Sequence, residues 1–120
     1  MGNQRIYLKK NFQITFVLAK DYQHLSQLLQ KENTIIGLEP DGKQLTSVEF
    51  SNFLYKKLEQ GGSRLSFVIG DKEGLPKDFS YPCISLSLMT FTHQMCRLIL
   101  VEQIYRAHSI QSGSSYHYFS

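Results

Sequence analysis

The clearest pattern of apolar and polar positions lies in the last third of the chain. Ile84, Leu86 and Leu88 alternate with polar serines, and this period of two predicts a β-strand. From residue 93 to about residue 110, apolar residues recur every three or four positions on one broad face, which is typical of a long helix. Thr92 stands directly before this helix and is expected to cap its first turn. The pattern therefore predicts a strand, a turn and a long helix in succession.

The long predicted helix and the tail behind it carry side chains suited to chemistry. Glu102 and Arg106 are four residues apart, in the order that favours an ion pair on a helix. Serine and glycine at residues 112–115 cannot extend the apolar stripe, so the helix should end before them. Tyr116 and His117 follow as an aromatic and titratable tail. From the residues alone, we interpret His117 as a solvated tail histidine, and Arg106 either holds an RNA phosphate or simply pairs with Glu102.

Upstream of this region, strands and helices alternate. Strands are predicted at residues 13–19, 34–38 and 65–69. One helix is predicted after the N-cap Asp21. A second helix begins at the capping box of Thr46 and Glu49 and ends at Gly61 and Gly62. Pro40, Asp41 and Gly42 predict a turn that closes the second of these strands. The strand at 65–69 is nearly all apolar, as expected of a strand buried on both faces of a parallel sheet. The sequence thus predicts an α/β fold, a mainly parallel sheet with helices on both faces.

Length and composition limit what such a fold can be. The chain has 120 residues, which suits one domain over residues 1–120. With 42% hydrophobic and 19% charged residues, it has the composition of a globular protein rather than a disordered one. The formal net charge of +3 permits an RNA partner without requiring one. No apolar run reaches the length of a membrane helix and no signal-peptide pattern opens the chain, so we expect no membrane partner.

The cysteines and histidines offer little for a metal site. Cys83 and Cys96 lack CxxC or His/Cys ligand spacing, so we expect no metal. We interpret both as reduced thiols of a cytoplasmic protein. His108 is expected at the surface of the long helix.

The basic N-terminal segment has two interpretations. Residues 1–20 contain no acidic residue and four basic ones, Arg5, Lys9, Lys10 and Lys20. A solvated terminus or an edge strand is favoured over an arm that contacts RNA. No firm element is assigned to residues 1–12.

Two places on the predicted sheet are suited to a small molecule, because ligands of open α/β sheets lie beyond the carboxyl ends of strands. Gly70 ends the strand at 65–69, and a glycine there lets the backbone approach a ligand, although the residues alone favour a plain turn. The second place is the stretch 86–91, where Met89 and Phe91 would more often belong to the core.

Short motifs between residues 34 and 117 occur together in a fixed order. They are residues 34–39 (TIIGLE), 42–43 (GK), 67–70 (FVIG), 73–75 (EGL), 86–91 (LSLMTF), 93–95 (HQM), 102–107 (EQIYRA) and 116–117 (YH). In this combination the chain resembles the RlmH family, SPOUT-class methyltransferases that modify a pseudouridine in 23S rRNA. It resembles an N-terminally shortened member that lacks a βα unit, so residues 1–12 align with no part of the family.

The resemblance implies a fold and a cofactor that the residue pattern does not reveal. In the SPOUT class, the C-terminal part of the chain is threaded through a loop as a deep trefoil knot, which here falls with the dimer helix in residues 84–117. S-adenosylmethionine lies bent in that knot. Carried over to this chain, its contacts are Leu38, Gly70, Leu86, Ser87, Leu88, Met89, Thr90 and Phe91. An apolar slot with main-chain hydrogen bonds suits an adenine ring.

The resemblance also implies the reaction and the partners. The family forms homodimers in which the tail of one subunit reaches the cofactor of the other, which makes Arg106, Tyr116 and His117 the candidate catalytic residues. The implied function is S-adenosylmethionine-dependent methylation of N3 of a pseudouridine in 23S rRNA within the ribosome. The alternative is a non-catalytic RNA- or ribosome-binding module that has kept the knotted fold. Asp71, where relatives have a second glycine, and Tyr118, where they have a basic residue, depart from the family pattern.

Overall fold

The computed structural model describes residues 4–8, 12–16, 21–32, 34–60, 64–70 and 73–116, the first two ranges by their backbone. The chain divides into two compact units, residues 1–31 and residues 32–120. Each unit has its own strands and helices, and each is described separately below.

The first unit contains a small antiparallel sheet and a short helix. Strand β1 (Gln4–Leu8) pairs with β2 (Phe12–Phe16), and Ile6 lies opposite Ile14. Helix α1 (Tyr22–Leu29) begins after Asp21, whose carboxylate accepts a hydrogen bond from the backbone N–H of His24 at 2.8 Å. The predicted N-cap at Asp21 is therefore confirmed. For residues 1–12 we favoured a solvated terminus or an edge strand, and β1 agrees with the second of these.

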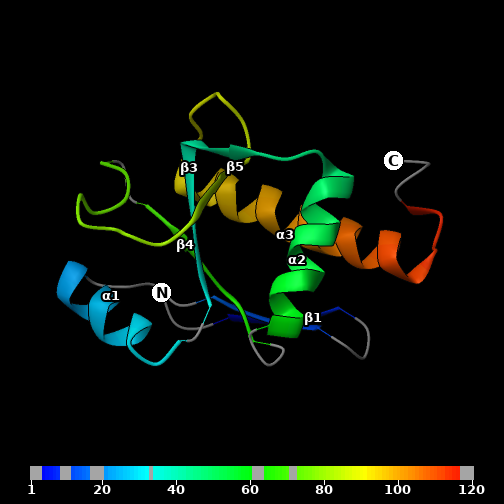
Figure 1. The fold of residues 1–120 in the computed structure, drawn as a ribbon, viewed down its shortest axis with the longest axis horizontal. Helices are drawn as coiled ribbons and strands as arrows, with labels where there is room; N and C mark the ends of the chain where they lie inside the picture. Colours follow the sequence, from blue (N-terminus) through cyan, green and yellow to red (C-terminus); the bar gives the residue numbers. More distant parts are fainter. Residues whose placement is uncertain are drawn as a thin grey trace. The chain divides into compact units, whose positions relative to one another are not determined.

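The second unit is organised around a three-stranded parallel sheet (Figure 1). Strand β3 (Ile35–Gln44) lies in the centre, between β4 (Ser66–Ile69) and β5 (Cys83–Ser85). Both neighbours run parallel to β3, and their register places Leu38 opposite Ile69 on one side and Ile84 on the other. The predicted α/β class with a parallel sheet is confirmed. The placement of helices on both faces and the knot stay predictions.

The centre of β3 departs from the predicted turn at Pro40–Gly42. The strand continues through these residues, and the pairing with β5 shifts register between Leu38 and Lys43, both of which lie opposite Ile84. Figure 1 shows β3 turning a corner at this irregularity. A Cβ on Gly42 would lie 2.7 Å from the backbone carbonyl carbon of Ile84, so a residue without a side chain allows the close approach. The prediction that a turn closes the strand was wrong, because β3 continues to Gln44 and pairs with β5 again beyond the irregularity.

Two other predicted strands differ in length or burial. The strand predicted at 84–88 is the shorter β5, because serine hydroxyls take up backbone groups beyond it: Ser85 donates to the carbonyl of Ser87 at 2.8 Å, and the N–H of Met89 donates to Ser87 Oγ at 3.0 Å. Strand β4 was expected to be buried on both faces, but only Val68 in it is buried. That expectation was wrong because β4 lies at the edge of the described sheet.

The two helices of the second unit begin at the predicted caps. Helix α2 (Ser47–Gln60) opens on a capping box, in which the N–H of Thr46 donates to Glu49 Oε1 at 2.8 Å and the N–H of Glu49 donates to Thr46 Oγ1 at 3.1 Å. Helix α3 (His93–Ser112) begins after Thr92, whose hydroxyl accepts from the N–H of Met95 at 3.3 Å. It ends at Ser112, two residues later than predicted, with Gly113 as its C-cap.

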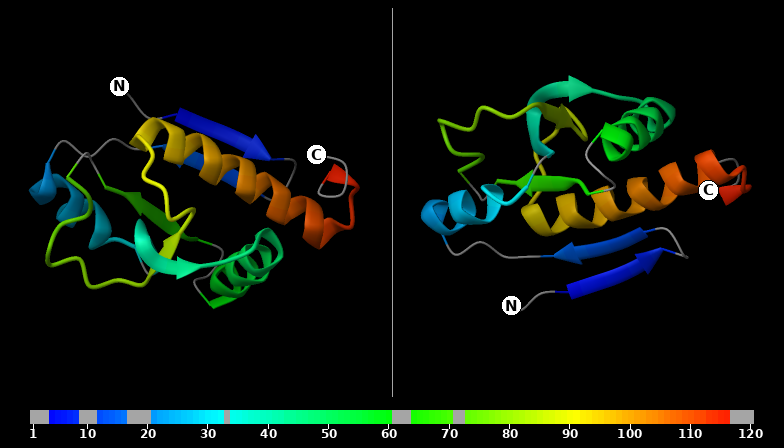
Figure 2. Two further views of the ribbon diagram at one scale, coloured as in Figure 1. Left: turned by 90° about the horizontal axis from the view of Figure 1, so that it is seen from above. Right: turned by 60° about the horizontal axis from the view of Figure 1, so that its bottom comes forward.

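Helix α2 packs against the C-terminal half of α3 (Figure 2). Apolar side chains from both helices are buried in the core, namely Phe50, Leu54, Leu100, Ile104 and Ala107. Hydrogen bonds reinforce the contact, because Ser51 Oγ donates to the carbonyl of Ala107 at 3.2 Å and Tyr55 Oη lies 3.1 Å from His108 Nδ1. His108 is 6% exposed, so the expectation that it lies on the surface was wrong.

We predict that Leu54→Ala destabilises the protein far more than Val48→Ala in the same helix. Leu54 is 2% exposed, and truncation should lower the free energy of unfolding by about 2–5 kcal/mol because it leaves a cavity. Val48 is 47% exposed, and its truncation should change that free energy by no more than about 0.5 kcal/mol. Urea unfolding measures both, and equal losses would contradict the α2 packing.

Candidate functional site

Three predicted cofactor residues lie in or next to the strands of the parallel sheet. Leu38 is buried in β3, opposite Ile69 and Ile84. Gly70 directly follows β4, and Leu86 directly follows β5. Gly70 and Leu86 therefore lie just beyond the carboxyl ends of β4 and β5, where ligands of open α/β sheets bind, whereas β3 continues past Leu38 to Gln44.

Gly70 lies against the chain's own backbone. A Cβ at this position would be 2.4 Å from the carbonyl carbon of Gly74 and 2.6 Å from the nitrogen of Leu75. The loop after β4 thus folds back onto the end of the strand, and this contact alone requires a residue without a side chain. Asp71, a departure from the family pattern, lies outside the described residues.

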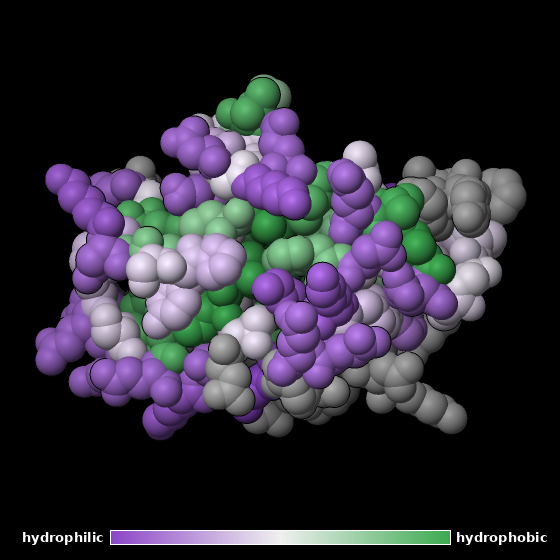
Figure 3. Space-filling model, viewed as in Figure 1, coloured by the Kyte–Doolittle hydropathy of each residue, from purple (hydrophilic) through white to green (hydrophobic). Residues whose placement is uncertain are grey.

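The loop from Leu86 to Phe91 presents apolar side chains to solvent. Leu88 is 74% exposed and Met89 is 71% exposed, while Phe91 is half-buried. Figure 3 shows hydrophobic atoms gathered at the tip of this loop, at the top of the view. The expectation that Met89 belongs to the core was wrong, because β5 ends at Ser85 and the chain leaves the sheet before residue 89.

A cavity of about 140 Å³ lies where the end of β5 meets α2 and α3. Its lining includes Ser47 from α2, Ser85 and Leu86 from the end of β5, and Gln103 from α3. Small-molecule sites usually measure about 300–1,000 Å³, so this cavity is too small for a whole cofactor. Of the predicted cofactor residues, Leu86 lines this cavity.

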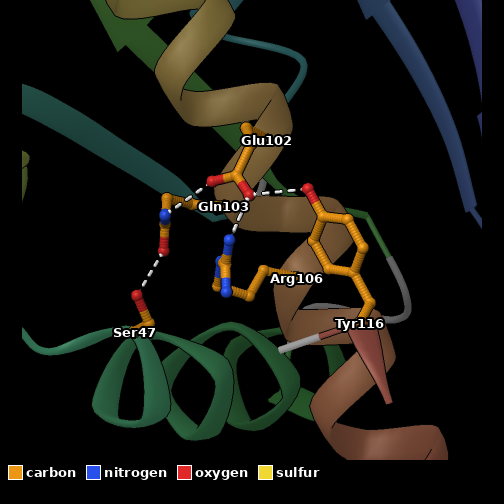
Figure 4. Close-up of polar contacts among 5 residues, drawn as sticks. All are labelled: Ser47, Glu102, Gln103, Arg106 and Tyr116. Carbon is orange, nitrogen blue, oxygen red and sulfur yellow. Dashed lines mark hydrogen bonds and ion pairs between the residues drawn. The ribbon is translucent and has the colours of Figure 1, made fainter. Parts of the chain in front are cut away.

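A polar cluster on α3 gathers two of the three predicted catalytic residues (Figure 4). The carboxylate of Glu102 accepts hydrogen bonds from Arg106, at 2.8 Å from Nη2 and 3.1 Å from Nε, so the predicted ion pair is confirmed. The same oxygen, Oε2, accepts a hydrogen bond from the Tyr116 hydroxyl at 2.9 Å. His117 lies outside the described residues.

Further contacts anchor this cluster to its surroundings. Gln103 donates from Nε2 to Glu102 Oε1 at 2.7 Å, and its own Oε1 accepts from Ser47 Oγ at 2.8 Å. These two bonds connect the Glu102 carboxylate to the first residue of α2. The Tyr116 ring meets Tyr105 edge-on, with ring centroids 4.7 Å apart.

The hydrogen bonds shift the pKa values of both Glu102 and Tyr116. Burial alone would raise the pKa of the Glu102 carboxyl, but the hydrogen bonds from Arg106 and Tyr116 outweigh it and lower that pKa below its ordinary value. The hydrogen bond to Glu102 raises the pKa of the Tyr116 phenol. Tyr116 is therefore a neutral hydrogen-bond donor at neutral pH in this arrangement.

Sequence reasoning found the Glu102–Arg106 pair but missed the contact between Glu102 and Tyr116. These residues are 14 positions apart, and helical spacing gives no reason to join them. Gly113 supplied the only sequence signal, because a glycine at a helix end allows the chain to reverse direction. Its φ of +77° lies in the left-handed region, as that reversal requires.

The described residues contain no group of three or more histidine, cysteine, aspartate or glutamate side chains that could hold a metal ion. Cys83 and Cys96 are both free thiols. Among the described helices, none combines the length and apolar character needed to span a membrane.

A family model described as "Predicted SPOUT methyltransferase" matches residues 5–117. The match includes residues 5–12, so the expectation that this stretch aligns with no part of the family was wrong. A protein of Protochlamydia amoebophila, named ribosomal RNA large subunit methyltransferase H, is 54% identical over 112 residues. The chain belongs to the RlmH family of SPOUT methyltransferases. The alignment with the Protochlamydia protein covers 92% of this chain and 80% of that relative.

Two further RlmH relatives come from Bacteroides fragilis strains and carry the same printed name. Each is 42% identical over 102 residues, which cover 82% of this chain. The chain spans 65% of the length of each of these two relatives.

Membership of the RlmH family implies a methyl donor. The types of residue beyond the carboxyl end of β5 are suited to binding such a molecule. The loop at 86–91 offers peptide groups outside any helix or strand, together with the exposed side chains of Leu88 and Met89. Such a combination suits the flat, partly apolar base of a nucleoside.

We predict that Gly70→Ala destabilises the protein through the loop after β4. The added Cβ meets backbone that cannot move aside alone, so the free energy of unfolding should fall by about 1–3 kcal/mol. Lys77→Ala, an exposed substitution in the same segment, should change it by no more than about 0.5 kcal/mol. Urea unfolding of both variants is the measurement. An unchanged stability for Gly70→Ala would mean that Gly74 and Leu75 do not close over the strand end.

Proposed function

We propose that this protein is an S-adenosylmethionine-dependent methyltransferase that acts on N3 of a pseudouridine in 23S rRNA. The observation that carries the proposal is the 54% identity over 92% of the chain to a protein named ribosomal RNA large subunit methyltransferase H. Because its substrate would be the ribosome, we place its action in the cytoplasm.

The carboxyl edge of the sheet would hold the methyl donor. Leu38 lies in β3 between Ile69 of β4 and Ile84 of β5. Gly70 allows the loop at Gly74 and Leu75 to pack against the end of β4. The loop residues Leu86, Ser87, Leu88, Met89, Thr90 and Phe91 would surround the adenosyl group with apolar side chains and peptide groups. S-adenosylmethionine, when bound, supplies a methyl group activated by its sulfonium.

The tail would act on the acceptor base. N3 of pseudouridine is an imide nitrogen that must lose its proton as the methyl group arrives, so a proton acceptor near it speeds the reaction. His117 is the residue we assign to this proton, because imidazole titrates close to neutral pH. The Arg106 guanidinium would orient the RNA through a phosphate.

Transfer also requires the donor and the acceptor to be held in line. We propose that a homodimer with the trefoil knot of the SPOUT class achieves this, the tail of one subunit completing the site of the other. Exposed apolar side chains on and just before α3 support an interface there. They are Leu88, Met89, Met95 at 45% exposure and Leu98 at 64% exposure.

The proposed reaction predicts that the wild-type protein transfers a labelled methyl group to ribosomes from a strain lacking this modification. Mass spectrometry of the rRNA should place the label on N3 of a pseudouridine. His117→Ala should slow transfer by about 10²–10⁴-fold, as the loss of a general base does, while calorimetry shows unchanged cofactor affinity. His93→Ala is the control, since His93 is an exposed first residue of α3.

A protein that binds S-adenosylmethionine but labels no rRNA in free, large-subunit or assembled form would overturn the substrate assignment. It would favour the non-catalytic RNA- or ribosome-binding alternative. A full rate in His117→Ala would remove that residue from catalysis and leave the reaction itself in place.

The proposed interface predicts that Leu98→Asp breaks the dimer. A charge at this exposed apolar position should be costly to bury against a second copy, so light scattering at low micromolar concentration should report a dimer for wild type and a monomer for the variant. Val48→Asp, at an exposed apolar position of α2, should remain dimeric. A wild-type monomer that methylates rRNA at full rate would refute a shared site.

A further inference from the structure

One carboxylate, that of Glu102, lies at the centre of the polar cluster on α3. It accepts hydrogen bonds from Arg106, Gln103 and Tyr116 (Figure 4). Arg106 and Gln103 belong to the same helix as Glu102, whereas Tyr116 belongs to the tail. Glu102 is thus the residue through which the helix holds the tail.

The chain reaches this position by reversing direction at the end of α3. Gly113 adopts a φ of +77°, and the N–H of Ser114 donates to the carbonyl of Ser109 at 3.0 Å. The hydroxyls of Ser109 and Ser114 also hydrogen-bond to each other. This turn directs Tyr116 back along α3 toward Glu102.

Three contacts fix the Tyr116 side chain once the chain has turned. Its hydroxyl bonds to Glu102, its ring meets the ring of Tyr105 edge-on, and the Arg106 guanidinium lies 5.0 Å from its ring centroid. The Arg106 side chain is only 14% exposed, so this guanidinium is held rather than freely moving in solvent. Tyr116 is the last described residue before His117, so these contacts fix the point from which the rest of the tail continues.

We propose that Glu102 is a positioning residue, which holds the tail by its bond to the Tyr116 hydroxyl and so places His117 at the acceptor base. Tyr116 accordingly serves as the anchor of the tail and not as the proton acceptor. This inference rests on the proposed function, in which His117 takes the proton from the acceptor nitrogen.

The competing interpretation is that Glu102 forms a simple surface ion pair with Arg106. Such a pair contributes little and leaves the tail unaffected when it is removed. The two interpretations differ in what they predict for the Tyr116 hydroxyl. Its loss should affect the tail if Glu102 is a positioning residue and should have no effect if Glu102 only pairs with Arg106.

The test uses Glu102→Gln, Tyr116→Phe and the double variant in the full chain. Hydrogen exchange read by mass spectrometry should show the amides of residues 113–118 exchanging about tenfold faster in each single variant, because a charge-assisted hydrogen bond has been lost. The double variant should exchange no faster than the singles, since both remove the same bond. Glu59→Gln, an exposed carboxylate near the end of α2, is the matched control and should leave the tail unchanged.

A second readout follows the Tyr116 phenol directly. Carbon-13 labelling of tyrosine, with the Tyr116 signal assigned by its absence in Tyr116→Phe, allows its pKa to be measured by NMR. Wild type should show a raised pKa, and Glu102→Gln should lower it toward the ordinary tyrosine value. Neither this measurement nor hydrogen exchange requires enzyme activity, so failure of the proposed function is distinguishable from failure of this inference.

Methyl transfer supplies the third readout. Each single variant should lower kcat on the order of ten- to a hundredfold, with cofactor affinity and the KM for ribosomes nearly unchanged, because a tail out of place weakens the transition state rather than binding. Unchanged tail exchange in both Glu102→Gln and Tyr116→Phe would overturn the inference. If Glu102→Gln does not fold, Tyr116→Phe decides alone, since it removes only the hydroxyl.

Discussion

Pairing to β3 is the interaction on which the second unit depends. Within the described sheet, β3 is the strand with a neighbour on each side, and its first four residues are all buried. Because all three strands run parallel, each must return across the unit before it can pair, and this returns every carboxyl end to one edge. Gly70 and Leu86 follow the carboxyl ends of the two strands that pair with β3, and Leu38 lies opposite Ile69 in one of them and Ile84 in the other.

The candidate site combines two kinds of construction. The donor side is made by the course of the backbone, with Gly70 closing against Gly74 and Leu75. The tail side is made by side-chain charge and aromatic contact around Glu102 and Tyr116. The first kind tolerates changes of side chain as long as the backbone path is kept. The second kind depends on the identity of each side chain and weakens as the carboxylate is protonated.

The sequence predicted the elements that local physics decides. The caps at Asp21 and Thr92 and the capping box at Thr46 were foreseen because each involves residues three positions apart. The errors concern contacts between distant segments. The bulge in β3 depends on the backbone at Ile84, more than forty residues away, and no local pattern contains that information.

The same limit applied to the candidate site. Helical spacing predicted the ion pair on α3, whereas the contact from Glu102 to Tyr116 required knowledge of the path after Gly113. Motif resemblance supplied the cofactor residues, since no local pattern joins residues 38, 70 and 86–91. One error had a local cause: the exposure of Met89 was missed because hydrogen bonds of the Ser85 and Ser87 hydroxyls ended the strand early.

The brevity of β5 has an energetic consequence for ligand binding. Ile84 and Ser85 in β5 are buried, but the strand ends at Ser85 and the loop that follows exposes its apolar tip, and exposed segments open more easily than the buried core. A ligand seated on this loop must therefore order the loop as it binds, and part of the interaction free energy goes into that ordering. Ligand binding and the local ordering of residues 86–91 are thermodynamically linked, so occupancy stabilises the loop that holds the ligand.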